Sequence, residues 1–133
     1  MRKAISAYAI AVLLLCGIAF SATATAIAPT EYGNILGRVA DQNASGIANA
    51  IVKIVDASDT SIVYFTGTTD SRGLFYFTEV NNTWNETSGT YTPKYKAHAS
   101  LNIDSQTYVG YSSNFTVEAN SIAMVCMVLY ITP

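Results

Sequence analysis

The stretch TGTTDSRGLFYF, residues 66–77, decides the fold because it joins a turn to the strand that follows it. Asp70 can accept backbone N–H bonds across such a turn, and Gly73 can adopt the positive φ that a tight turn needs. Apolar side chains then alternate, so that Phe75 and Phe77 share one side of the strand and their neighbours share the other. The stretch therefore predicts a hairpin corner whose phenylalanines face the core, and no catalytic pair is needed to explain its polar residues.

The same alternation runs through the rest of the chain, and no segment after residue 28 has a helical period. Turn-forming residues such as those of QNASG, SDT and EANS separate the alternating runs. The strands are expected at residues 34–41, 48–57, 61–69, 74–80, 91–101, 107–117 and 122–131. Seven short strands spaced about ten residues apart predict an all-β fold, a seven-stranded antiparallel β-sandwich.

Two of these strands carry further constraints. Pro93 has no N–H to give to a β-ladder, so it is expected at the start of the fifth strand or on an edge. The last strand, IAMVCMVLYI, is apolar on both faces. It is therefore predicted either to be central in its sheet or to be covered by another surface.

The N-terminal residues have the layout of a secretory signal peptide. Arg2 and Lys3 precede an uncharged run over residues 6–20, which is short for a membrane span, and SATATA follows. Ala24 and Ala26 have the A-x-A spacing that signal peptidase recognises. The sequence thus predicts a leader over residues 1–26, cleaved after Ala26, and a β-sandwich domain over residues 27–133.

A second interpretation of the N-terminus stays open. Arg2-Lys3-Ala4, followed by a long uncharged run, also resembles the class III signal of type IV pilin-like proteins. That resemblance implies cleavage after Ala4 and a retained hydrophobic helix over residues 5–28, about 36 Å long. Such a helix would lie in a membrane or in the core of a filament.

The charge balance excludes one class of partner. The chain has 7 basic and 9 acidic residues, and removal of Arg2 and Lys3 with the leader leaves 5 and 9, a net charge of −4. No basic cluster occurs in the sequence, whereas phosphate neutralisation requires clustered Lys and Arg. Nucleic acid is therefore not an expected partner.

The two cysteines are separated by the predicted cleavage. Cys16 lies in the leader, so that a cleaved chain keeps only Cys126 and has no intramolecular disulfide. In an apolar strand a single cysteine is expected to be a small buried hydrophobe, and an intermolecular bridge is the alternative.

The opening stretch also carries a family resemblance. The pattern T-x-T-D-x-x-G-x-F-x-F resembles the signature of carboxypeptidase regulatory-like domains, which are transthyretin-like (prealbumin-like) β-sandwiches of seven strands, similar in architecture to immunoglobulin-like domains. Upstream, ILGRVADQNASGIANAIVKIVD is similar to the opening of that family, and SGTYTPKYKAHAS is similar to its G-x-Y strand. The residues that carry the resemblance are Thr66, Thr68 or Thr69, Asp70, Gly73, Phe75, Phe77, Gly37, Val39, Asp41, Gly46, Ala50, Val52, Gly89 and Tyr91.

The resemblance implies an accessory role. Members of this family serve as stabilising or carbohydrate-associated modules of secreted and surface proteins. The catalytic residues of carboxypeptidases lie in a different domain, and nothing in this sequence corresponds to them. No enzymatic activity and no cofactor are therefore expected.

Metal binding is weakly supported by the sequence. DQNASG, residues 41–46, begins like a calcium loop, but the twelfth position, which needs a bidentate carboxylate, is Val52. A hairpin turn explains Asp41 and Gly46 equally well. His98 is the only histidine, so a zinc site is not expected and a structural or surface role is favoured.

The loop NNTWNETSG suggests carbohydrate in two ways. Four N-x-S/T sequons predict N-glycosylation in a secreted chain, at Asn43, Asn81, Asn85 and Asn114. Trp84, together with Tyr91 or Tyr95, could stack on a sugar ring, although covering the end of the sandwich is favoured for these aromatics.

Three functions remain open from the sequence. The leading hypothesis is a non-enzymatic, secreted or cell-surface module that acts in envelope structure, extracellular assembly or adhesion, through contact with other proteins or with itself. The alternatives are a type IV pilin-like filament subunit and a carbohydrate-binding module. An enzyme is the least supported class, because no G-x-S-x-G elbow or metal cluster occurs.

Overall fold

The computed structural model describes residues 29–132, and all regular structure in that range is β. The predicted leader, both cleavage sites, the retained helix and Cys16 lie outside the described residues. Within residues 29–132 no helix has the length and apolar character needed to cross a membrane. The strands are β1 (Gly33–Asp41), β2 (Ile51–Asp56), β3 (Val63–Thr68), β4 (Leu74–Val80), β5 (Trp84–Asn85), β6 (Thr90–Tyr91), β7 (Tyr95–Ile103), β8 (Gln106–Tyr111) and β9 (Ile122–Leu129).

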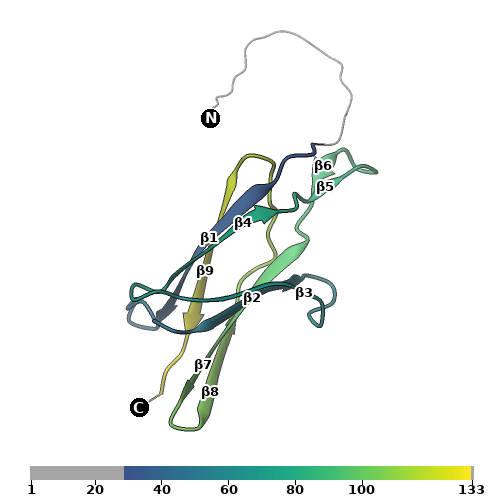
Figure 1. The fold of residues 1–133 in the computed structure, drawn as a ribbon. Coiled ribbons are helices and arrows are strands. Elements are labelled where there is room, and N and C mark those ends of the chain that lie inside the picture. Colours follow the sequence, from purple (N-terminus) through teal and green to yellow (C-terminus); the bar gives the residue numbers. More distant parts are fainter. Residues whose placement is uncertain (1–28, 133) are drawn as a thin grey trace.

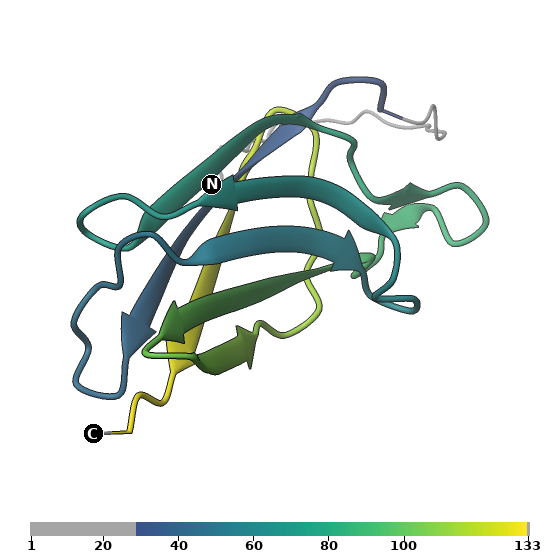
Figure 2. The ribbon, with the colours of Figure 1, turned by 60° about the horizontal axis from the view of Figure 1, so that its bottom comes forward.

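Seven of the strands form two sheets that pack face to face (Figure 1). One sheet has the order β4-β1-β9 and the other has the order β3-β2-β7-β8. The short hairpin of β5 and β6 projects from one end of the molecule (Figure 2). The prediction of an all-β sandwich is confirmed.

The sequence predicted a wholly antiparallel sandwich, and one pair of strands departs from that prediction. β1 and β9 pair in parallel, in a register that runs from Asn34 opposite Ile122 to Asp41 opposite Leu129. Parallel neighbours need a long crossover between them, and here almost the entire domain forms it. Alternation within each segment cannot show that the first and last strands become neighbours, which is why the antiparallel prediction was wrong for this pair.

β9 lies at the edge of its sheet, which excludes the first of the two predicted alternatives, a central strand, and leaves the second, a strand covered by another surface. Val125, Met127 and Leu129 face the core, whereas Met124 and Val128 on the opposite face are exposed. Both faces are apolar, as the sequence shows, but only one of them is covered within this chain. Near its C-terminal end β9 also approaches β8 closely, since a Cβ added at Gly110 would lie 2.7 Å from the carbonyl oxygen of Val128.

The fifth and sixth expected strands differ from the structure. Tyr91 belongs to β6, which forms the small hairpin with β5. Pro93 lies between this hairpin and β7, which begins only at Tyr95. β8 ends at Tyr111, and the chain keeps a single bridge to β7, between Tyr95 and Phe115, before it crosses to β9 in the other sheet. A proline cannot continue a ladder, and a chain that changes sheets leaves its strand.

The core lies between the two sheets. Ile35 and Val39 of β1 are fully buried against the second sheet, where Val52 and Ile54 of β2 are also fully buried. Phe75 is buried and Phe77 packs beside it at a ring distance of 5.9 Å, whereas Tyr76 between them is 52 % exposed. The inward orientation predicted for the two phenylalanines is therefore what the structure shows.

Candidate functional site

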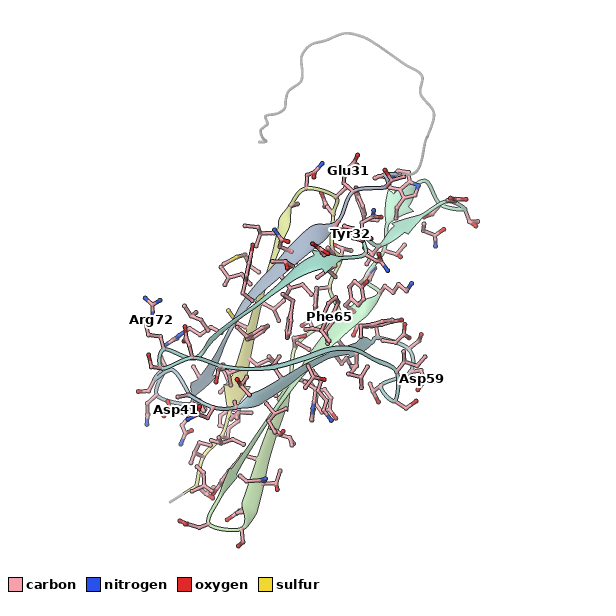
Figure 3. All side chains as sticks on the ribbon, viewed as in Figure 1. Glu31, Tyr32, Asp41, Asp59, Phe65 and Arg72 are labelled. Carbon is pink, nitrogen blue, oxygen red and sulfur yellow. The ribbon has the colours of Figure 1, made fainter. Side chains whose placement is uncertain are left out.

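Two turns of the same design lie at one end of the sandwich, where Figure 3 labels Asp41 and Arg72. Asp70 Oδ1 accepts hydrogen bonds from the backbone N–H groups of Arg72 and Leu74, at 2.8 and 2.9 Å. These bonds lower the pKa of the Asp70 carboxyl. Asp41 Oδ1 accepts from the N–H groups of Asn43 and Ser45 in the same pattern.

The glycines of the two turns pack against each other. A Cβ added at Gly46 would lie 2.1 Å from the carbonyl oxygen of Arg72, and one added at Gly73 would lie 2.3 Å from that of Val39. Gly73 also has a φ of +82°. The polar residues of the stretch 66–77 therefore have a structural role, because they form the turn at one corner of the sandwich.

Of the two candidate threonines, Thr68 is exposed and Thr69 is buried. The Thr69 hydroxyl accepts a hydrogen bond from the N–H of Ala50 and donates one to the carbonyl of Ile47. It thereby fixes the chain that enters β2.

Neither turn presents a ligand set for a metal. Both carboxylates are engaged by backbone N–H groups of their own turns, and residues 29–132 contain no group of three or more His, Cys, Asp or Glu side chains that could hold an ion. The hairpin-turn interpretation of DQNASG accounts for every contact that Asp41 makes.

The aromatic residues proposed for sugar stacking do not form one surface. Tyr95 is buried in the core, where its ring packs edge-on against Tyr64 and its hydroxyl donates to the carbonyl of Asn81. Burial raises the pKa of Tyr95 to about 12. Its inclusion in a stacking platform was therefore wrong. Trp84 is half-buried and meets Tyr91 edge-on at 5.2 Å across the β5–β6 hairpin.

The sequons lie at or near the surface. Asn43, Asn81 and Asn114 are exposed, whereas Asn85 is half-buried and its Oδ1 accepts the N–H groups of Thr87 and Ser88. Glycosylation at these four positions stays a prediction.

Cys126 departs from expectation, because its thiol is exposed rather than buried. It belongs to the set of β9 residues that point away from the core. His98 lies in the middle of β7 on the outer face of the second sheet, opposite Lys53 of β2 and Tyr111 of β8.

The feature that stands out is the outer face of the β4-β1-β9 sheet. The strand register places Tyr76, Leu36 and Met124 in one row across the three strands, and Leu74, Arg38 and Cys126 in the next. We call this surface the outer apolar face and define it by Leu36, Leu74, Tyr76, Ile122, Met124, Cys126, Val128 and Tyr130.

The outer apolar face is strongly exposed. Met124 and Tyr130 are 72 % and 73 % exposed, and Tyr76 and Ile122 are about half exposed. Monomeric proteins rarely leave a contiguous apolar patch of more than a few hundred Å² in water. Water-facing sheet surfaces ordinarily carry polar side chains instead.

Arg38 is the one charged side chain in the two middle rows described above, and its hydrogen bonds go to the backbone of this chain. Its guanidinium donates to the carbonyl oxygen of Ala44 at 2.9 Å and to that of Arg72 at 3.4 Å. No acidic residue occurs within residues 36–40, 74–78 or 122–130, which supply the face, and the acids of these strands lie at its ends, Asp41 at the end of β1 and the exposed Glu79 near the end of β4. A hollow of about 330 Å³ lies beside Arg38, between Cys126, Val128, Tyr130 and the turn at Asp41.

Sequence reasoning missed this face because it is assembled from three strands. The apolar character of both sides of β9 was visible, and it was the signal that could have found the surface. The contributions of Leu36 and Tyr76 appear only once the order β4-β1-β9 is known.

Comparisons with known proteins leave the family open. No family model matches the chain, and no curated protein matches it. Among solved structures, the shaft pilin SpaA of Lactobacillus rhamnosus GG is 14 % identical with a TM-score of 0.41, over 77 % of this chain and 49 % of that chain. The 3-chlorocatechol 1,2-dioxygenase of Rhodococcus opacus 1CP is 12 % identical with a TM-score of 0.43, over 98 % and 78 %.

A 9R-lipoxygenase of Cyanothece PCC8801 is 13 % identical with a TM-score of 0.40, over 84 % of this chain and 18 % of that chain. This chain thus spans about half the length of the pilin chain and a smaller share of the lipoxygenase. At these values the likeness does not identify a function.

Proposed function

We propose that this protein is a non-enzymatic, extracellular or cell-surface module, and that two copies assemble through the outer apolar face. The single observation that carries the proposal is that face, an exposed apolar sheet surface whose middle rows carry no acidic side chain. The leader layout and the sequons support an extracellular location.

The size of the face suits a second copy. The large side chains of the face that are about half or more exposed offer on the order of 500 Å² per copy, since a tyrosine alone buries 150–250 Å² when covered. Two such faces would together bury about 1,000 Å², the threshold of a specific interface.

The chemistry of the face also favours a copy of itself. The one charged side chain in its middle rows, Arg38, donates to the backbone carbonyls of Ala44 and Arg72. The apolar side chains around Arg38 are complementary to those of an identical surface, and twofold pairing of sheets buries both at once.

Thiol cross-linking tests this pairing, because Cys126 lies in the middle of the face. In a chain that carries Cys16→Ser, a short bismaleimide is expected to link two copies through Cys126. The matched control removes that thiol by Cys126→Ser and adds Thr107→Cys, which is exposed on β8 of the other sheet. Equal yields from the two chains, or no cross-link through Cys126, would contradict the proposal.

The filament alternative concerns residues outside the described range, so it rests on the sequence. Intact mass and N-terminal sequencing of the protein from its own cells decide it. A chain that begins at Ile27 supports a released or envelope-associated module. A chain that begins at Ile5 supports a pilin-like subunit with a retained helix.

A further inference from the structure

The outer face of the β3-β2-β7-β8 sheet carries a group of three basic side chains. Lys53 of β2 lies directly opposite His98 of β7, and Lys96 lies on the same face two residues before His98. Side chains directly opposite one another in a sheet have Cβ atoms about 4.5–5.5 Å apart, and diagonal neighbours are about 7–8 Å apart. The Lys53 ammonium and the His98 imidazole are therefore close neighbours, with the Lys96 ammonium diagonal to Lys53.

Lys53 and His98 border a hollow, and Lys96 lies outside its lining, next to Tyr111. The hollow has a volume of about 300 Å³ and is lined by Lys53, His98 and Tyr111, with Thr60 and Ser61 of the preceding loop at its rim and the buried Val55 at its floor. The Tyr111 ring lies 4.7 Å from the imidazole of His98 and 5.7 Å from Lys96 Nζ. Tyr111 therefore lies beside both basic groups at one wall.

The other side chains that the register places on this face are uncharged, among them Ile51, Thr66, Thr68, Ser100 and Val109. The nearest acid along the chain is Asp56 at the end of β2, whose carboxylate accepts hydrogen bonds from the hydroxyls of Ser58 and Tyr64. Asp59 of the loop after β2 accepts hydrogen bonds from the N–H and hydroxyl of Ser61. Two of the five basic residues within residues 29–132 and the single histidine thus meet in an otherwise acidic domain.

The surroundings of His98 change the pKa of its imidazole. Burial lowers the pKa of His98, and the positive charge of Lys53 lowers it further. An anion placed in the hollow would oppose the effect of Lys53, so that binding and protonation of His98 become linked.

We propose that Lys53 and His98 form a binding site for an oxyanion, a phosphate, sulfate or carboxylate group. The Lys53 ammonium donates a charge-assisted hydrogen bond to the anion, and the imidazole donates one through a ring N–H. Lys96, over the ring of Tyr111, adds positive charge beside the site. The Thr60 hydroxyl adds a neutral donor at the rim. This site lies on the sheet opposite the outer apolar face, so its success or failure is independent of the pairing proposed above.

Nuclear magnetic resonance of the single histidine tests the site directly. Inorganic phosphate, inorganic sulfate and an oligogalacturonate are titrated in separate arms, each against sodium chloride of equal ionic strength, because chloride screens charge without offering an oxyanion. Saturable movement of the His98 resonances and a rise in the pKa of His98 are expected with at least one of the three. The arm with the highest affinity identifies the anion.

Two variants complete the test. Lys53→Gln is expected to lower the affinity about tenfold, since it removes a charge-assisted hydrogen bond. Lys94→Gln, at an exposed lysine just before β7 that does not line the hollow, is expected to leave it unchanged. The proposal is overturned if no arm exceeds the sodium chloride control, or if the two variants lose affinity equally.

Discussion

Gly46 and Gly73 explain at the residue scale why the polar stretch that opens the sequence is structural. A Cβ at Gly46 would overlap the Arg72 carbonyl oxygen of the opposite turn, and a Cβ at Gly73 would overlap the carbonyl oxygen of Val39 in β1. Asp41 and Asp70 close those turns with equivalent pairs of N–H bonds. The aspartates and glycines of DQNASG and DSRG thus build two turns that pack against each other.

Replacing Gly73 by alanine is expected to destabilise the domain by more than about 2 kcal/mol, because backbone strain and a clash with the Val39 carbonyl add together. Gly89 is the matched control. It also has a positive φ, of +68°, but nothing lies within 4 Å of an added Cβ, so Gly89→Ala should cost only about 1 kcal/mol. Urea unfolding measures both, and equal losses would show that the two turns do not pack as described.

Asp56 links stability to pH. Its carboxylate accepts hydrogen bonds from the hydroxyls of Ser58 and Tyr64 and from two backbone N–H groups, and these bonds lower the pKa of Asp56. A group with a lowered pKa in the folded state stabilises the fold above its unfolded value, near 3.8, and loses that contribution as the pH falls through the folded value.

The expected result is a fall in the urea midpoint of the natural chain below about pH 4, and a smaller fall over the same range in Asp56→Asn. Asp104→Asn, at an exposed turn position, should keep the pH dependence of the natural chain. Parallel pH curves for the natural chain and Asp56→Asn would exclude this role for Asp56.

At the scale of the strands, local pattern predicted most of what the structure contains. β1 to β4 lie within a few residues of their expected positions, because each is an alternating run bounded by turn residues. The parallel pairing of β1 with β9 and the edge position of β9 were not predictable in this way. They depend on which distant strands become neighbours, and alternation carries no information about that.

The contact between β1 and β4 shows how such pairing constrains a single residue. Gly37 lies opposite Phe75, whose ring covers it so closely that a Cβ at Gly37 would lie 2.0 Å from the ring. Gly37→Ala should therefore cost about 1–3 kcal/mol by overpacking. Combining it with Phe75→Leu, which removes the ring, should cost less than the sum of the two single changes, as a double-mutant cycle by urea unfolding would show. Strict additivity would contradict the contact.

The candidate surfaces were harder to predict than the fold, because strand pairing decides which residues lie side by side on them. Tyr95 and Trp84 were grouped by closeness in sequence, but alternation buries the first and leaves the second on a separate hairpin. Lys53 and His98 are far apart in sequence and become neighbours only through the pairing of β2 with β7.

For the whole molecule, the two outer surfaces of the sandwich differ in character. The middle rows of the β4-β1-β9 sheet present apolar side chains and no acid, and the β3-β2-β7-β8 sheet presents a basic hollow among hydroxyl and apolar side chains. The first surface suits association with a copy of the chain, and the second suits a small anionic group. A module with two such faces can assemble through one and bind through the other.

Sedimentation equilibrium of the protein and of Met124→Glu tests the central claim most directly. The natural chain is expected to form a concentration-dependent dimer, and Met124→Glu, which buries a charge in that interface, should weaken association by at least about tenfold. Ile103→Glu, an exposed apolar position on β7 of the other sheet, should associate as the natural chain does. A natural chain that stays monomeric to hundreds of micromolar, or equal association of both variants, would contradict assembly through the outer apolar face.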